Sequence, residues 1–423
     1  MSHFGDSTRL SLLTISDRFR WVYCQLDTLR RCMPSSIRKV LNELPTTLDD
    51  TYERALQEIP KEKCQHARHL FQCLVGAIRP LRVEEFAEIF AINFDADSSP
   101  DLMEGWRPEN PEEAVLSTCS TLITVIEDEG SKIVQFCHFS VKEYLTSDRL
   151  RTSDVGNTGL YYIPLDAAHT FLARSCLAVL LQLDENVNKN RLATFPLAFY
   201  AARYWVNHAK FEDVASRIQD GIERLFYPGN PYLAAWAWIY DVAWDRFGRS
   251  IDTLTEHPSL PEATALYYAV LCGFSGVANY LICTHAEDVN ALGDDHGTPL
   301  RAASSGGHLD VVHLLLQHNA NVNDARGPWN WTALHEASDC GHPKVVKLLL
   351  EHGAEVNAIS AAHNTPLRCA SNEGYLEVVQ MLLEHGADVH IRGESNMTPY
   401  HVAGQVGHTK VAQLLLEHSA KKY

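Results

Sequence analysis

Four side chains of the kinds that bind metal ions lie close together in the sequence: Cys64, His66, His69 and Cys73. Thiolates and imidazoles are the usual ligands of structural zinc, and they occur in pairs such as C-x-x-C and H-x-x-x-H. The spacing here fits no such pattern. Three of the four can share one helix face, but Cys64 cannot easily join them. We therefore predict an ordinary helix here and no metal site.

The acidic stretch 95–101 begins like a calcium-binding loop. Such a loop needs glycine at its sixth position, where the chain turns sharply, and glutamate at its twelfth, which binds the ion through both oxygens. Pro100 and Trp106 occupy these positions, so we interpret the stretch as part of a solvated loop over 95–113. The hydrolase motifs G-x-S-x-G and H-E-x-x-H are absent from the sequence. We predict no catalytic residue, no metal and no cofactor.

Histidine is abundant, and its positions recur. Of the 21 histidines, 14 lie at or after His285. Two sets recur at nearly constant spacing, and they are His318, His352, His385 and His418, and His308, His342 and His408. Recurrence at a fixed period predicts a structural role, such as a hydrogen bond to the backbone of a neighbouring turn, rather than catalysis.

The histidines follow a repeat in the sequence itself. Five similar segments begin 34, 34, 33 and 33 residues apart, at Thr264, Thr298, Thr332, Thr365 and Thr398. Each contains a run of small residues closed by a glycine, and these glycines are Gly273, Gly307, Gly341, Gly374 and Gly407. A second segment follows, with three successive apolar residues in most repeats, as in 348–350. The period predicts stacked pairs of helices, because one unit has too little apolar surface to fold alone.

The repeats resemble the ankyrin family, whose T-P-L-H box is closely matched at 298–300, 332–335 and 365–367. The resemblance implies a β-turn finger and two antiparallel helices in each unit. It also implies a protein partner bound by the finger tips and the first helices. The candidate partner-binding residues on these elements are Trp329, Asn330, Trp331, Glu336, Asp339, Asn372, Glu373 and Gln405.

Two features of the repeats allow more than one interpretation. A tryptophan in a solvent-facing turn is costly unless it packs or binds, so Trp329 is either an interaction anchor or a side chain folded over its own or the next finger. The first repeat has Tyr267, Tyr268 and Phe274 in place of small and polar residues. We interpret this repeat as a junction with the preceding part of the chain.

The first 150 residues predict helices, then a hairpin, then another helix, which is the layout of a winged helix. Helices are expected over 48–59 and 83–92, and a hairpin is expected from the β-branched segments 122–126 and 133–136. Residues 140–143 have the spacing of a capping box, which predicts that the last helix starts at Ser140.

Several runs in this region resemble NACHT proteins. Residues 19–27, 44–52 and 79–81 are similar to the arm that follows their nucleotide-binding core, and 136–145 is similar to the end of their winged helix. An arm followed by ankyrin repeats is the architecture of STAND-type receptors of filamentous fungi. In that family the histidine at the position of His138 contacts the phosphate of bound ADP. The resemblance gives His138 a latent nucleotide-contacting role, and local packing or hydrogen bonding is the alternative.

The sequence contains no Gly-Lys pair, so the P-loop motif of the NACHT core is absent from it. The glycine-rich cradle and the lysine that hold nucleotide phosphates are missing, and nucleotide binding is not expected. This favours a non-catalytic protein-protein interaction module that recognises a partner through its repeats. The alternative is a remnant or fragment of a NACHT-type nucleotide-dependent switch, with the NTPase core upstream in a longer reading frame or in a partner chain.

The charge is acidic throughout. The net charge is −17 in all, with −7 in residues 1–150, −2 in 151–261 and −8 in 262–423. No segment is basic, which argues against nucleic acid, including through the winged helix, and against an anionic membrane as partner. An acidic repeat array is better suited to a neutral or basic protein surface.

Together these observations predict a mainly α fold with three domains. Residues 1–150 form a NACHT-associated helical arm and a winged-helix-like domain, 151–261 form an α-helical domain, and 262–423 form an α-solenoid of about five ankyrin repeats. Scattered cysteines without a C-x-x-C pair predict reduced thiols, and residues 1–13 lack the pattern of a signal peptide. We therefore expect a cytoplasmic protein.

Overall fold

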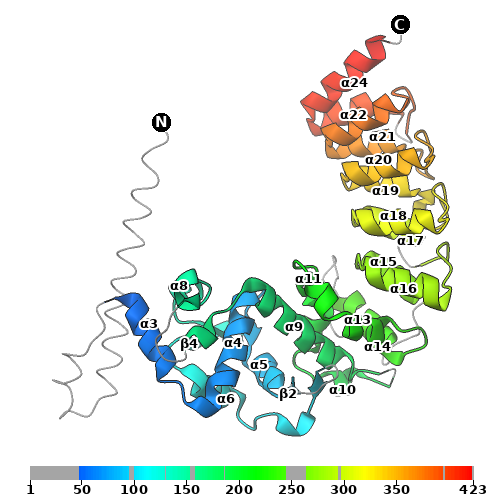
Figure 1. Cartoon of the computed structure of the whole chain (residues 1–423). Helices are drawn as coiled ribbons and strands as arrows, with labels where there is room; N and C mark the ends of the chain where they lie inside the picture. Colours follow the sequence, from blue (N-terminus) through cyan, green and yellow to red (C-terminus); the bar gives the residue numbers. More distant parts are fainter. Residues whose placement is uncertain are drawn as a thin grey trace, which may run out of the picture. The chain divides into compact units, whose positions relative to one another are not determined.

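The computed structural model describes residues 47–94, 100–128, 130–152, 158–184, 186–243, 263–293, 297–393 and 396–421. The chain divides into two compact units, which are described separately (Figure 1). The first unit extends to Gly221 and includes the end of helix α14 from Ile239. The second comprises Ile222–Trp238 and the described residues from 263 onwards. The run 19–27, the first three residues of 44–52 and most of the acidic stretch 95–101 lie outside the described residues.

Helix α9 is the centre of the first unit and packs against α4, α11 and α12. The helices of this unit are α3 (Leu48–Gln57), α4 (Cys64–Gly76), α5 (Val83–Phe90), α6 (Pro111–Cys119), α7 (Phe139–Leu145), α8 (Asp148–Arg151), α9 (Leu165–Leu180), α10 (Lys189–Leu192), α11 (Ala198–Ala209) and α12 (Val214–Arg217). Because α9 has neighbours on several sides, ten of its 16 residues are buried.

The predicted hairpin is present in the first unit. Strand β4 (Ile123–Asp128) pairs antiparallel with β5 (Ser131–Phe136), with Val125 opposite Val134. The short strand β1 (Leu81–Arg82) pairs with the other edge of β5, so the strand order is β1-β5-β4. A second, two-stranded sheet joins β2 (Ile92–Asn93) to β3 (Asp101–Leu102). The hairpin leads directly into α7, which is the winged-helix layout predicted from the sequence.

The predicted N-cap of the last helix is wrong by two residues. Helix α7 begins at Phe139, and its N-cap is His138 rather than Ser140. The ring nitrogen Nδ1 of His138 accepts a hydrogen bond from the backbone N–H of Ser140 at 3.3 Å. The imidazole therefore takes the position that a serine side chain has in a capping box.

The expected loop over 95–113 is also partly wrong, because its described residues contain β3 and the start of α6. Asn110 accepts a hydrogen bond from the backbone N–H of Glu113 at 3.2 Å, and Pro111 is the first residue of the helix. An asparagine cap followed by proline is a helix-start signal, and the high proline and acidic content of the stretch obscured it.

A buried carboxylate joins α5 to α11. Glu88 is 1% exposed, and one of its oxygens accepts a hydrogen bond from the backbone N–H of Leu197 at 2.6 Å, where α11 begins. Its other oxygen lies 2.5 Å from the guanidinium group of Arg107. Burial nonetheless raises the pKa of Glu88 to about 7. Helix α11 has no side-chain cap of its own, so this carboxylate supplies the negative group at its N-terminus.

Helix α11 also carries a buried histidine within a chain of hydrogen bonds. His208 is 0% exposed, and its Nε2 lies 2.9 Å from the hydroxyl of Tyr200. Its Nδ1 lies 2.8 Å from Nδ1 of His169 on α9. The hydroxyl of Tyr200 accepts a hydrogen bond from the backbone N–H of Ile78 at 3.3 Å. Burial, followed by the neighbouring His169, lowers the pKa of His208 to about 3, so the ring is neutral in the folded protein.

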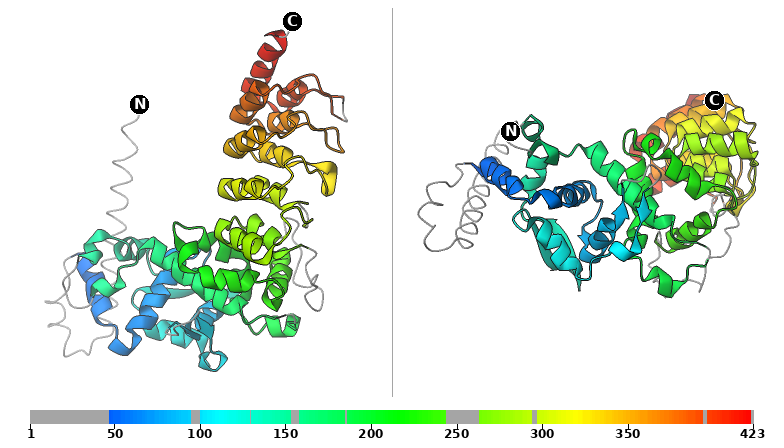
Figure 2. Two further views of the ribbon diagram at one scale, coloured as in Figure 1. Left: turned by 45° about the vertical axis from the view of Figure 1, so that its right-hand side comes forward. Right: turned by 60° about the horizontal axis from the view of Figure 1, so that its bottom comes forward.

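The second unit contains the repeats. Its helices are the end of α13 (Gln219–Phe226), most of α14 (Pro231–Ala243), and the pairs α15 (Ala265–Leu271) and α16 (Ser275–His285), α17 (Pro299–Ser305) and α18 (Leu309–Gln317), α19 (Ala333–Asp339) and α20 (Pro343–Glu351), α21 (Pro366–Glu373) and α22 (Leu376–Glu384), and α23 (Pro399–Val406) and α24 (Thr409–Lys421). First helices stack on first helices and second helices on second helices (Figure 2).

The sequence period is reproduced in the packing of these pairs. The middle leucine of three apolar runs is fully buried, at Leu315, Leu349 and Leu382. The five glycines predicted to end the first helices all have left-handed φ, between 68° and 94°. The predicted ankyrin architecture is therefore confirmed by the fold.

The aromatic residues of the first repeat pack on α13 and α14. Tyr268 lies edge-on to Trp236 with ring centroids 5.7 Å apart, and Phe274 lies edge-on to Phe226 at 6.3 Å. Trp236 is fully buried. These two helix segments thus cover the side of the first repeat that has no preceding repeat.

Two further properties concern the described residues as a whole. None of their helices is long and apolar enough to cross a membrane. Every cysteine within the described ranges is a free thiol.

The buried histidine makes stability depend on pH. Because the folded pKa of His208 lies below its ordinary value, its contribution is complete above pH 6.5 and is lost as the pH falls toward the folded pKa of about 3. We expect the free energy of unfolding to fall by about 2 kcal/mol between neutral pH and pH 5 from this group alone. Urea unfolding at both pH values tests this. The His208→Asn variant should show a smaller pH dependence, whereas His313→Asn, at an exposed position, should behave as wild type. Equal pH dependence in all three proteins would contradict the prediction.

Candidate protein-binding surface

Threonine caps and a histidine position the first helices of the repeats. The hydroxyl of Thr298 accepts a hydrogen bond from the backbone N–H of Arg301 at 3.4 Å. The backbone N–H of Thr332 donates to Nδ1 of His335 at 3.2 Å, and Nε2–H of the same ring donates to the carbonyl of Asn364 at 3.0 Å. Each cap fixes the start of a helix, and His335 also fixes the finger of the following repeat.

Four of the recurring histidines, His308, His342, His352 and His385, bond to backbone carbonyls as their period predicted. Nε2–H of His308 donates to the carbonyl of Leu271 at 3.2 Å, and that of His342 donates to the carbonyl of Ser305 at 2.9 Å. In the other set, His352 donates from Nδ1 to the carbonyl four residues earlier at 2.9 Å. These bonds hold one repeat to the next or close the end of a second helix.

Glu336, predicted to face the groove, is buried instead. It is 7% exposed, and its carboxylate lies 2.9 Å from Nη2 of Arg301 in the preceding repeat. Arg301 is 2% exposed, and its Nη1–H donates to the carbonyl of Arg326 at 3.1 Å. A buried guanidinium needs a buried anion. Glu336 is therefore part of the contact between two repeats, and the accessible part of the predicted surface lies elsewhere.

The three finger residues predicted to bind a partner lie between α18 and α19. Trp329 is 70% exposed and Asn330 is also exposed. Trp331 is half-buried, because its ring stacks on His335 with centroids 5.8 Å apart. Of the two alternatives left open for Trp329, the structure therefore has the side chain in solvent rather than folded over a finger.

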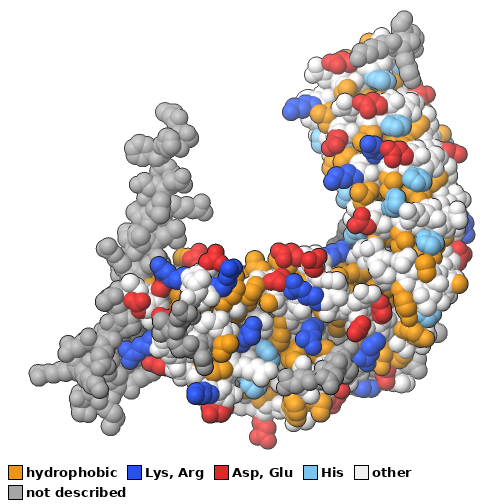
Figure 3. Space-filling view, viewed as in Figure 1, with side chains coloured by type: hydrophobic (Ala, Val, Ile, Leu, Met, Phe, Trp, Pro, Cys, Tyr) orange, Lys and Arg blue, Asp and Glu red, His pale blue; other side chains and the backbone are white. Residues whose placement is uncertain are grey.

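The four remaining predicted residues lie at the C-terminal ends of the first helices. Asn372, Glu373 and Gln405 are exposed, and Asp339 is half-buried. The amide of Asn372 donates to the carboxylate of Glu373 at 2.7 Å. Acidic side chains recur along the visible face of the repeat stack, together with histidines (Figure 3). Asp339 and Glu373 end the first helices of two successive repeats.

The carboxyl group of Asp339 has a perturbed pKa. Burial, followed by the neighbouring carboxylates of Glu373 and Glu336, raises this pKa to about 6. Within the described residues, Asp339 forms no ion pair. At neutral pH the carboxylate of Asp339 is therefore ionised in a place where burial and its acidic neighbours both disfavour the charged form.

The metal-type side chains at α4 contact other groups. His69 stacks on Phe171 with ring centroids 4.5 Å apart, and His66 lies edge-on to a phenylalanine ring. Cys73 is fully buried, which raises the pKa of its thiol. Cys64 donates to a backbone carbonyl one turn earlier at 3.5 Å. No three His, Cys, Asp or Glu side chains are grouped to hold a metal ion in the part of the chain that the structure describes.

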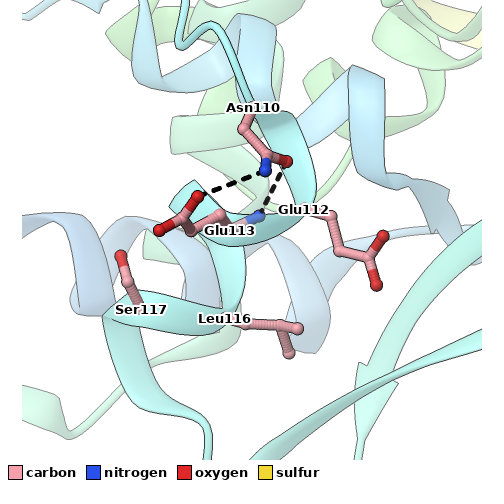
Figure 4. A pocket seen from close by; sticks show the side chains of 5 residues that line it. All are labelled: Asn110, Glu112, Glu113, Leu116 and Ser117. Atoms are coloured by element: carbon pink, nitrogen blue, oxygen red, sulfur yellow. Dashed lines mark hydrogen bonds between the residues drawn. The ribbon is translucent and has the colours of Figure 1, made fainter.

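A surface hollow of about 450 Å³ borders α6 and is lined by Asn110, Glu112, Glu113, Leu116 and Ser117 (Figure 4). Its polar groups take part in local interactions. The amide of Asn110 donates to the carboxylate of Glu113 at 3.2 Å, and Glu112 lies 2.6 Å from the ammonium of Lys132. None of the predicted partner-binding residues lines this hollow.

His138 lies in the winged-helix part of the first unit. Its Nδ1 is 2.6 Å from the hydroxyl of Ser140, which is in turn 2.8 Å from the hydroxyl of Tyr52 on α3. Its ring also contacts Phe139, with centroids 4.3 Å apart. These contacts correspond to the local role that the sequence left open. The nucleotide contact stays a prediction from the resemblance.

Two residues that contribute to the repeat surface or its support were not among the predicted ones: the buried Arg301 and the exposed Ile359. Arg301 stands where the T-P-L-H box has histidine, and this substitution is a signal that its side chain has a different partner. Ile359 is 55% exposed on the finger before α21, and nothing in the repeat pattern distinguishes it from a packed finger residue.

The comparisons with known families agree with this architecture. Residues 266–360 and 359–423 match the family described as ankyrin repeats (3 copies). Residues 52–156 match the winged helix domain of GPI inositol-deacylase. The chain therefore contains ankyrin repeats and a winged helix domain of that type, as the resemblance to the C-terminal part of NACHT proteins implied.

Parts of the chain are similar in sequence to three known proteins. The chain is 33% identical over 297 residues to azaphilone pigments biosynthesis cluster protein L of the fungus Monascus ruber. This match covers 67% of the present chain and 61% of that protein. It is 45% identical over 58 residues to ankyrin repeat and KH domain-containing protein mask of Drosophila melanogaster, and 42% over 60 residues to BCL-6 corepressor-like protein 1 of Mus musculus. The latter two matches cover 14% of this chain and only 1% and 3% of those proteins. The chain thus spans about three fifths of the first relative's length.

The buried ion pair predicts a difference between two glutamates. Glu336→Ala removes the buried carboxylate that lies against the guanidinium of Arg301, and we expect a loss of about 3–5 kcal/mol in the free energy of unfolding. Glu373→Ala removes an exposed carboxylate and should change it by less than about 0.5 kcal/mol. Chemical denaturation measures both. The double variant Arg301→Met, Glu336→Met should recover part of the loss, since it leaves no charge unpaired. Similar unfolding curves for the two single variants would contradict the assignment.

Proposed function

We propose that this chain is a non-catalytic protein-protein interaction module that recognises its partner through the ankyrin repeats. The repeat array and its similarity to a named ankyrin repeat protein support this proposal. The partner-binding surface consists of the accessible predicted residues, which are Trp329, Asn330, Asp339, Asn372, Glu373 and Gln405. A cytoplasmic location belongs to the same proposal.

The placement of Asp339 is the observation that carries the proposal. It is the last residue of α19, and Glu373 is the last residue of α21. Carboxylates at helix C-termini face the negative end of the helix dipole and lower stability. Asp339 is also half-buried and has no ion-pair partner among the described residues. Residues that lower stability at an accessible surface are typical of binding sites, and a cation supplied by a partner would relieve this cost.

The charge of the repeats indicates the chemistry of the partner. Residues 262–423 contain 9 basic and 17 acidic residues. Such a surface attracts a basic protein segment and repels nucleic acid and anionic membranes. The partner is therefore a protein that presents lysine or arginine side chains.

Replacing Asp339 should stabilise the protein and weaken its binding. In Asp339→Asn the disfavoured charge is absent, so we expect an increase of about 1 kcal/mol in the free energy of unfolding at pH 7.5 after allowance for solvent screening. The sign follows from the raised pKa: the wild-type carboxyl contributes full stability below pH 3.8 and loses it as the pH rises through about 6. The gain should therefore vanish at pH 3.5.

The binding test uses the full chain as bait in native lysate. We expect the double variant that combines Asp339→Asn with Glu373→Gln to lose the proteins that wild type retains. The control double variant combines Glu377→Gln with Glu384→Gln, which removes two exposed charges from α22, and it should keep them. If both double variants retain the same proteins, this surface is not the binding site. A stabilised Asp339→Asn variant that no longer binds excludes misfolding as the cause.

The winged helix favours a second candidate function, which is that of one part of a nucleotide-dependent switch. The match of residues 52–156 to a winged helix domain and the position of His138 support it. We expect no change in melting temperature with millimolar ADP or Mg-ATP, and no ATP hydrolysis, if the chain is an interaction module alone. A nucleotide-dependent rise in melting temperature that His138→Ala removes would favour the switch instead.

A further inference from the structure

The finger between α18 and α19 is held in an uncommon conformation. The φ angles of Trp329 and Asn330 are 65° and 51°, and that of Gly327 is 109°. A left-handed conformation at a bulky residue is unfavourable and persists only where surrounding contacts impose it. Here the carbonyl of Trp329 accepts a hydrogen bond from the backbone N–H of Ala361 in the next finger, at 2.9 Å. The tip is therefore joined to the next finger through its backbone.

The result is an apolar surface on two adjacent fingers. Trp329 is the most exposed of the large apolar side chains in the described part of the chain, at 70%. Ile359 is 55% exposed, two residues before Ala361, whose N–H bonds to Trp329. We call Trp329 and Ile359 the finger patch. Exposed large apolar side chains on two fingers that a backbone hydrogen bond joins are typical of the energetic centre of an interface.

Trp329 of the finger patch and the carboxylate of Asp339 lie at opposite ends of the same first helix, α19. Trp329 precedes α19, and Asp339 ends it. A seven-residue helix is about 10 Å long, and the finger adds roughly 5 Å, so the two features are about 15 Å apart. An extended peptide covers this distance with about four to six residues.

We propose that the finger patch is the apolar anchor for an extended segment of the protein partner, whose basic side chains lie against Asp339 and Glu373. The segment thus carries a large apolar residue and a lysine or arginine about four to six positions apart. The inference rests on the proposed function and deepens it, since it specifies the recognised sequence. A rigid tip costs little further order on binding, and the carboxylates set the direction in which the segment lies.

Charge decides between this occupant and a second copy of the chain. Two copies would bring together repeat surfaces that each have a net charge of −8. Repulsion between them opposes self-association, whereas a basic segment is attracted to the same surface. The partner is therefore a different protein.

The test is a selection from a library of random peptides about 12 residues long, with the full chain as bait. Parallel baits are Trp329→Asn and Asp339→Asn, and Trp106→Ala is the matched control, because Trp106 is 55% exposed in the first unit. Asparagine tolerates left-handed φ, so Trp329→Asn keeps the finger conformation while it removes the ring. Sedimentation of each protein reports self-association.

The expected result is that wild type and Trp106→Ala enrich peptides with an apolar and a basic residue four to six positions apart. Trp329→Asn should lose the apolar preference and keep the basic one, and the affinity of a selected peptide should fall at least about tenfold. An unchanged selection with Trp329→Asn overturns the inference and leaves the proposed function standing. No enrichment by wild type overturns both. Self-association that Trp329→Asn abolishes would assign the patch to a second copy and also overturn the inference.

Discussion

The spacing between repeats depends on a close approach of one ring to one glycine. A Cβ atom added to Gly307 would lie 2.6 Å from the ring of His342 in the next repeat, and φ at this glycine is 68°. The position requires both a left-handed conformation and the absence of a side chain. The same ring donates to the carbonyl of Ser305 at 2.9 Å, so approach and hydrogen bond reinforce each other. Where this contact recurs it keeps the first helices in register, and that register brings acidic groups of successive repeats together.

The interior of the repeats is more polar than a leucine-rich period indicates. At the fourth position of the T-P-L-H box, His335 makes a neutral hydrogen bond to the next finger, whereas Arg301 brings a charge into the same place. That charge requires Glu336 from the following repeat. The side chains that line the surface and those that join the repeats therefore come from the same helix, α19, and only burial distinguishes Glu336 from Asp339.

The sequence predicted what is periodic and local. The repeats and their closing glycines followed from residue types at a fixed spacing, and the hairpin followed from two β-branched segments. Most of the predicted finger and helix-end residues are accessible. Prediction from the sequence failed where a side chain's interaction partner is far away in the sequence or is of an unusual type. Glu336 has its partner 35 residues away, and the start of α7 depends on an imidazole that accepts a bond usually accepted by serine. The conformation of Trp329 was not predictable either, because it depends on a hydrogen bond from the next finger.

The packing of Trp236 and Phe226 on the first repeat has a practical meaning for work on this protein. By sequence the array starts at Thr264, but physically its hydrophobic core starts within α13, before Phe226. A recombinant fragment cut at the first threonine would present Tyr268 and Phe274 to water. Such a fragment would bind other proteins through this newly exposed surface, and its interaction partners would be artefacts of the cut.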